Sequence, residues 1–152
     1  MNTWLIKSAP EEYSLEAFAR DKVTQWTGVR NYQARNNLIA MRKGDLAFFY
    51  YSQMSPPAIV GECVVERSAY PDPTQFDSKS DYFDEKSSEE KPRWSSVDLK
   101  FLRSYSVPLS IDTMREVPGL KAMALFKSSR LSVQPVTPAE YTILKKLLLK
   151  GN

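Results

Sequence analysis

The 152-residue sequence contains no histidine and only one cysteine, Cys63. Without histidine, the chain cannot build a Ser-His or Cys-His nucleophile, a histidine general base, or the commonest protein ligand for transition metals. Cys63 cannot form an internal disulfide, and the apolar run AIVGECVVE around it predicts a small buried side chain rather than a reactive thiol. These absences exclude a large part of enzyme chemistry, and we expect no catalytic residue and no metal.

Glycines and long apolar runs are also scarce. The five glycines match neither G-x-G-x-x-G nor G-x-x-x-x-G-K-[ST], so neither phosphate-binding loop is present and we expect no cofactor. No stretch approaches the roughly 20 apolar residues that a membrane span requires. The start of the chain, MNTWLIKSAPEEY, has too short an apolar run for a signal peptide. We therefore expect no membrane association and a cytoplasmic location.

What is present is the composition of an ordinary globular domain. Hydrophobic residues make up 42% of the chain and charged residues 26%, with a net charge of +3. A chain of this length buries about 70% of the surface that its unfolded form exposes, so one real core is feasible. Residues 96–152 hold nine Lys or Arg against four Asp or Glu, whereas residues 71–95 hold seven acidic and four basic residues. We expect a basic face and an acidic loop to coexist in a single domain over residues 1–152.

The pattern of turns and apolar residues predicts several strands and a few short helices. A helix should begin after Ser14, a second should cover about 30–40, and SIDTMREV predicts a short third helix. Thr137 with Glu140 forms a capping box for a fourth. The segment from 71 to 94 has no steady period and predicts a long surface loop. Strands are expected in TWLIK, LAFFYYS, AIVGECVVERSAY, SSVDLKFLRSYSVPL and RLSVQPV. We predict an α+β fold, a mixed β-barrel flanked by short helices.

The segment WTGVRNYQARNNL, residues 26–38, concentrates arginines and side-chain amides at a helix start. Gly28 can provide a turn, and the free N–H groups of a helix N-terminus suit a phosphate or a polar base edge. Arg30 and Arg35 would strengthen that positive field, and Asn31 offers both a donor and an acceptor to a base. The alternative is that the amides only cap the local backbone while the arginines are solvated.

Aromatic residues surround this polar segment in the sequence. Trp26 precedes the turn, Trp94 ends the long loop, and the predicted strand contains FFYY. Strand alternation places only one residue of each adjacent pair in a core, so we expect some of these rings to face a second surface. Together with the amides they would form a pocket for one flat, hydrogen-bonding ligand. The alternative for each ring is ordinary core packing.

Carboxylates provide the alternative functions. Without histidine, a hydrolase would need paired Asp or Glu, and Glu11 and Glu62 are candidates for an enzyme acting on a modified nucleotide. The acidic segment 71–95 could instead bind a protein partner, as in an adaptor. The spacing of these carboxylates selects neither function, because charged runs on loops are usually solvated.

Several segments of the chain resemble, in order, the signature segments of the EVE domain family. The resemblance runs from Trp4 to about Leu147 and is most specific in two of the segments, GVRNYQARN and RLSVQPV. Two departures are visible: Tyr51 and Gln53 stand where the family more often has histidine and asparagine, and Ala9 replaces a common acidic residue. The segments are WLIKSAPEEYS, WTGVRNYQARNNL, KGDLAFFYYS, AIVGECVVERSAYPDPTQFD, KPRWSSVDL and RLSVQPVTPAEY.

The resemblance implies a PUA-like fold and a non-catalytic domain that recognises a modified base of DNA or RNA in an aromatic pocket. Trp26 and an aromatic of FFYY would enclose the base while Ser8 and Asn31 contact its edge. The expected phosphate-binding residues are Arg30, Arg35 and Arg130. The base-pocket residues that we expect are Lys7, Ser8, Trp26, Val29, Asn31, Phe49 and Tyr50, with Trp94 nearby.

Overall fold

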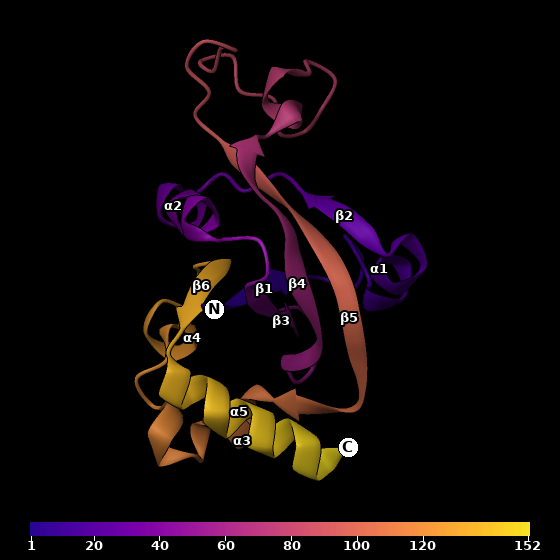
Figure 1. Cartoon of the computed structure of the whole chain (residues 1–152), viewed down its shortest axis with the longest axis vertical. Coiled ribbons are helices and arrows are strands. Elements are labelled where there is room, and N and C mark those ends of the chain that lie inside the picture. The colour runs from indigo at the N-terminus through magenta and orange to yellow at the C-terminus, as the bar shows by residue number, and fades with distance from the viewer.

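The structure, a computed structural model, describes residues 1–152 and consists of one mixed sheet with helices on both of its faces (Figure 1). The strands are β1 (Thr3–Ser8), β2 (Val23–Trp26), β3 (Leu46–Tyr51), β4 (Ala58–Pro71), β5 (Ser95–Ser110) and β6 (Val133–Val136). The helices are α1 (Leu15–Asp21), α2 (Tyr32–Ala40), α3 (Ile111–Arg115), α4 (Ala124–Lys127) and α5 (Pro138–Gly151), with 3-10 turns η1 (Pro73–Phe76) and η2 (Pro118–Leu120). No helix is both long and apolar enough to cross a bilayer.

The six strands follow the order β2-β5-β4-β3-β1-β6. All neighbours are antiparallel except β1 and β3, which run parallel. The sheet is open, because β2 and β6 are its two edges and do not pair with each other. The predicted mixed α+β class is therefore confirmed, and all five predicted strand segments form strands.

β3 is buried along its whole length, so the expectation that alternate aromatics of FFYY face another surface is wrong. Phe49 and Tyr51 belong to a core covered by α1 and α2, whereas Phe48 and Tyr50 belong to a second core covered by α3, α4 and α5. Both faces of the sheet are thus packed, and a strand between two cores needs apolar residues at every position. The Tyr51 hydroxyl even accepts a hydrogen bond from the Leu15 amide at 2.6 Å.

Two helices, α1 and α5, begin at the predicted capping residues. The Ser14 side chain accepts from the Ala17 amide, and the Thr137–Glu140 capping box is complete. α2 begins at Tyr32, two residues later than predicted, because the Asn31 backbone is extended and its side chain caps the helix. An asparagine at this position satisfies a helix amide that would otherwise lack a partner.

Glu62 lies in the second core with no exposed surface. Its carboxylate accepts hydrogen bonds from the Lys145 ammonium of α5, at 3.0 Å to both oxygens, and from the Tyr105 hydroxyl, and it forms an ion pair with Arg103 at 3.3 Å. Burial and this carboxylate raise the pKa of Tyr105. Through Lys145, Glu62 links α5 to the sheet. Next to it, burial raises the pKa of the Cys63 thiol, as expected for a packed cysteine.

Candidate functional site

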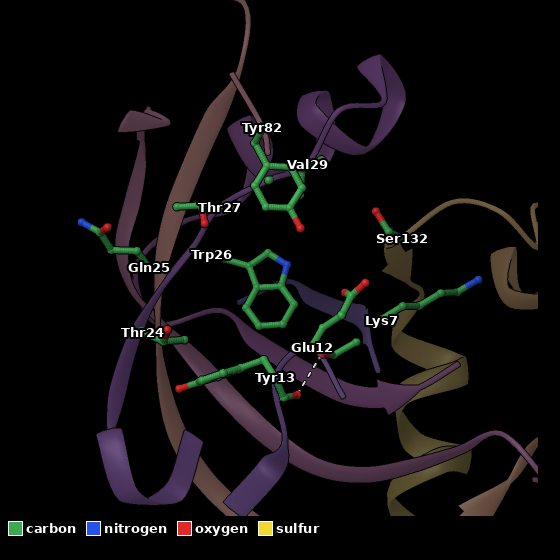
Figure 2. A pocket seen from close by; sticks show the side chains of 12 residues that line it. Lys7, Glu12, Tyr13, Thr24, Gln25, Trp26, Thr27, Val29, Tyr82 and Ser132 are labelled. Carbon is green, nitrogen blue, oxygen red and sulfur yellow. Dashed lines mark hydrogen bonds between the residues drawn. The ribbon is translucent and has the colours of Figure 1, made fainter. Parts of the chain in front are cut away.

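An open cavity of about 420 Å³ lies where the ends of β1 and β2 meet the turns before α1 and α2 (Figure 2). Part of its wall comes from the segment between β4 and β5, which projects beyond the sheet at the top of Figure 1. The lining residues are Lys7, Ser8, Glu12, Tyr13, Thr24, Gln25, Trp26, Thr27, Gly28, Val29, Tyr82 and Ser132.

Trp26, the last residue of β2, forms one aromatic wall of the cavity. Its ring packs edge-on against Phe49 at 5.9 Å and against Tyr13 at 6.3 Å, which fixes its orientation. The indole N–H groups of Trp4 and Trp94 donate to Asp45 and Asp84, at 3.0 and 2.7 Å. The indole N–H of Trp26 has no acceptor within the chain, so it is available to a ligand.

Tyr82 forms the opposite wall, and Gly28 makes its position possible. Gly28 has a φ of +85°, and a Cβ at this residue would lie 2.8 Å from the Tyr82 ring. The Gly28 amide donates to Asp72 at 2.8 Å, which fixes the turn. Figure 2 shows the Tyr82 ring above the Trp26 indole. Only a glycine allows the ring to lie so close to the turn.

Arg30 holds the segment 72–94 in place. Its guanidinium donates twice to the Tyr82 carbonyl, at 3.1 and 2.7 Å, and once each to Val29 O, Asp72 and Thr74, at 3.0, 2.9 and 3.0 Å. These contacts use all five N–H donors of an arginine side chain. Arg30 therefore has no N–H group left to donate to a phosphate, the contact that was predicted for it. Its side chain positions Tyr82 instead.

Trp94 and Tyr32 continue the packing behind Arg30. The guanidinium lies 5.6 Å from the Tyr82 ring and 5.4 Å from the Trp94 ring. The Trp94 and Tyr32 rings stack with their centroids 4.9 Å apart. The Arg35 guanidinium also lies over the Tyr32 ring, 4.8 Å from its centroid. This alternation of rings and guanidinium groups links α2 to the segment 72–94 through cation–π and stacking contacts.

Asp72 anchors the start of the same segment and has no exposed surface. Burial opposes its ionisation, yet hydrogen bonds from Thr74, Gly28 and Arg30 together outweigh this effect and lower the pKa of Asp72. A buried carboxylate with several donors and an ion-pair partner stays charged. The wall that carries Tyr82 is therefore built before any ligand arrives.

Polar groups from the β1 side complete the cavity. The Lys7 ammonium donates to the Ser129 carbonyl at 2.6 Å, and burial lowers the pKa of this lysine. The Ser8 hydroxyl donates to the Tyr13 carbonyl at 3.0 Å and so stabilises the turn before α1. Arg130, between Ser129 and the cavity residue Ser132, is exposed.

Four of the eight expected pocket residues line the cavity, namely Lys7, Ser8, Trp26 and Val29. The other four lie elsewhere, each for a physical reason. Phe49 packs beneath Trp26 in the first core, and Tyr50 faces the second core on the other side of the sheet. The exposed Asn31 uses its side-chain oxygen to cap α2 at 2.9 Å. Trp94 is buried behind Arg30.

Tyr82, Tyr13 and Glu12 line the cavity but were not among the expected pocket residues. Tyr82 lies in the acidic segment, where solvated side chains are the rule, and it reaches Gly28 only through contacts 44 to 52 residues apart in the chain. One signal was present: an aromatic residue within a long charged loop is unusual for a solvated segment.

Comparison with known proteins places this architecture in a family. The sequence model of the EVE domain matches residues 2–147. The chain belongs to the EVE domain family. Thymocyte nuclear protein 1 of Gallus gallus is 43% identical over 163 residues, which is 95% of this chain and 67% of that protein.

Two solved EVE-like structures superpose closely on the chain. A hypothetical protein from Leishmania major has a TM-score of 0.94 at 41% identity and covers 99% of this chain and 96% of its own. Human THYN1 protein, in complex with DNA containing 5-methylcytosine, has a TM-score of 0.92 at 37% identity and covers 97% of both chains.

Proposed function

We propose that this EVE domain binds nucleic acid and holds one modified base in the cavity between Trp26 and Tyr82. The observation that carries the proposal is the pair of aromatic walls around a cavity that contains unpaired polar groups. The human relative with the same fold binds DNA that contains 5-methylcytosine, which is a modified base. A base taken out of a nucleic acid is flat, apolar on its faces and polar at its edge, and the cavity matches each property.

The size and chemistry of the cavity suit such a ligand. A volume of about 420 Å³ lies within the range of roughly 300–1,000 Å³ that is common for small-ligand sites. Stacking on an aromatic side chain contributes about 1–3 kcal/mol per base. The indole N–H of Trp26 can then donate to a carbonyl oxygen or ring nitrogen at the edge of the base.

The flanking backbone would contact Lys7 and Arg130 beside the cavity. Both belong to the β1 and 129–132 side, where the chain carries positive charge, and Arg130 has a free, exposed side chain. Arg35 donates only one of its hydrogen bonds across the fold, to Arg93 O at 2.9 Å, so it keeps capacity for a phosphate. Arg30 is the exception, because its donors serve Tyr82 and Asp72.

We further propose that the domain is not an enzyme. Glu12 is the single carboxylate that lines the cavity, whereas acid–base hydrolysis without histidine would need a pair. Glu62, one of the alternative catalytic residues, is fully buried and ion-paired. Incubation of the protein with modified nucleosides, followed by mass spectrometry, tests this point: a new product would contradict it.

Four further expectations from the sequence remain proposals: the PUA-like barrel, the choice between DNA and RNA, the location in the cell and the adaptor role. The PUA-like barrel would correspond to the open sheet described above, with β2 and β6 as its unjoined edges. The choice between DNA and RNA, the cytoplasmic location and an adaptor role for the acidic segment stay predictions. Binding assays with matched DNA and RNA strands and imaging of a tagged chain would test the first two, and deletion of the acidic tip 85–90 the third.

Tyr82→Ala tests the base-binding proposal, because Tyr82 is 41% exposed and its removal spares both cores. We expect affinity for a single-stranded oligonucleotide with one 5-methylcytosine to fall at least about tenfold, since one stacking wall is lost. Phe83→Ala is the matched control, because Phe83 is the adjacent aromatic, is 43% exposed and does not line the cavity. Equal affinities of the two variants would refute the proposed site.

A further inference from the structure

Glu12 contributes a carboxylate to the cavity, and the chain offers this group no partner. No backbone or side-chain donor forms a hydrogen bond with its oxygens, although the Lys7 ammonium lines the same cavity. Figure 2 shows the Glu12 side chain directed into the space beside Trp26 and Lys7. The Lys7 ammonium instead donates to the Ser129 carbonyl, and the solvent-exposed Glu12 carboxylate remains free to accept a hydrogen bond from a ligand.

Backbone hydrogen bonds fix the turn that carries Glu12, and this limits the positions that its carboxylate can reach. The amides of Glu12 and Tyr13 both donate to the Ala9 carbonyl at 3.0 Å. The Ser8 hydroxyl donates to the Tyr13 carbonyl at 3.0 Å, and the Tyr13 ring packs against Trp26. The turn that carries Glu12 is therefore coupled to the aromatic wall on which a base would stack.

We infer that Glu12 accepts a hydrogen bond from the exocyclic amino group of the bound base, so that the cavity selects amino-bearing bases of the cytosine or adenine type. This inference rests on the proposed function, because it assigns a chemical class to the base in the same cavity. It makes Glu12 a specificity-determining residue, which the expected pocket residues did not include.

The chemistry of hydrogen bonding distinguishes the two classes of base. An ionised carboxylate only accepts hydrogen bonds. Cytosine N4 and adenine N6 are donors that carboxylates or amides recognise, whereas thymine and uracil present the O4 acceptor at the corresponding position. A carbonyl oxygen opposite Glu12 would bring two acceptors together with no hydrogen between them, so that edge of the base would gain no hydrogen bond from Glu12 and would meet its negative charge instead, which is unfavourable.

A pair of oligonucleotides tests the inference directly. The two single strands are identical except that one carries a 5-methylcytosine and the other a thymine, so that ring and methyl group are the same and only the N3–C4 edge differs. Single strands avoid the cost of breaking base pairs. We expect the wild-type protein to prefer the 5-methylcytosine strand by about tenfold, which corresponds to about 1.4 kcal/mol.

Glu12→Gln should abolish this preference, because the amide both donates and accepts and can bond with either edge. Glu11→Gln is the matched control: it removes the same charge from the neighbouring exposed residue, which does not line the cavity. We expect it to keep the wild-type preference. If Glu12→Gln keeps the wild-type preference, the inference about Glu12 is overturned while the proposed function stands. Failure of the wild-type protein to bind either strand overturns the proposed function, and the inference with it.

Discussion

Replacement of Arg30 by glutamine separates a structural role of this residue from a phosphate contact. The structure predicts that the change loosens segment 72–94, because the guanidinium makes five hydrogen bonds and an ion pair with the buried Asp72. Removal of one partner of a buried ion pair costs about 3–5 kcal/mol. The Arg30 side chain is 22% exposed, so we expect a value near 3 kcal/mol.

Native-state hydrogen exchange measures this effect at particular amides. The Asp84 amide donates to Gln75 O and the Trp94 amide to the Gln75 side chain, both at 3.0 Å, so they report on the closed segment. A local loss of about 3 kcal/mol lowers their protection roughly 100-fold. Amides of β3, between the two cores, should be unaffected. Base affinity should fall as well, because Tyr82 is no longer held above Gly28.

The salt dependence of binding gives the opposite signature for a phosphate contact. If Arg30 bound a phosphate, its removal would lower the single-strand salt slope by about 0.7 and leave exchange unchanged. We expect that result for Arg130→Gln, which serves as the positive control because Arg130 is exposed beside the cavity. Wild-type protection in Arg30→Gln together with a reduced slope would refute our assignment of Arg30.

Two further predictions follow from the backbone and from buried charge. Gly28→Ala should weaken base binding, because its Cβ would meet the Tyr82 ring. Gly44→Ala is the control, because Gly44 also has a positive φ, of +94°, but has open space around it. We expect similar destabilisation of both variants in thermal melts, and normal binding of Gly44→Ala in titrations. Burial opposes ionisation of Asp45, but hydrogen bonds from Trp4 and two backbone amides lower its pKa. A lowered pKa in the folded state makes the unfolded state bind more protons, so stability should fall as pH drops below about 4, and urea midpoints should fall less for Asp45→Asn.

Local signals in the sequence accounted for most of the fold. Ser14 and Thr137 cap helices through contacts that reach only three residues along the chain, so these two helix starts could be predicted. Whether the sheet closes into a barrel was harder to predict from the sequence. Closure of the sheet depends on pairing between the edge strands β2 and β6, and no local sequence pattern determines that pairing. The burial of β3 on both faces had a signal in its unbroken apolar run, which is typical of a strand between two cores.

The candidate site was predicted only in part, because half of it is assembled over long sequence distances. Lys7, Ser8, Trp26 and Val29 follow from the family resemblance and line the cavity. Tyr82 enters through the hydrogen bonds of Arg30, 52 residues away, and no periodicity or motif connects these residues. Long-range contacts of this kind determine which aromatic faces the cavity and which one packs behind it.

The place of β1 in the sheet has a consequence for synthesis of the chain. β1 precedes both of its sheet neighbours, β3 and β6, in the chain, and β6 begins only at Val133, far from the end of β1 at Ser8. Leu5 and Ile6, which are fully buried in the folded protein, can pair with β3 early but lack their second neighbour until β6 has been synthesised. Such late, non-local pairing slows folding and leaves apolar strands open to aggregation. A chaperone that shields β1 during synthesis should increase the yield of this protein more than one that acts after release.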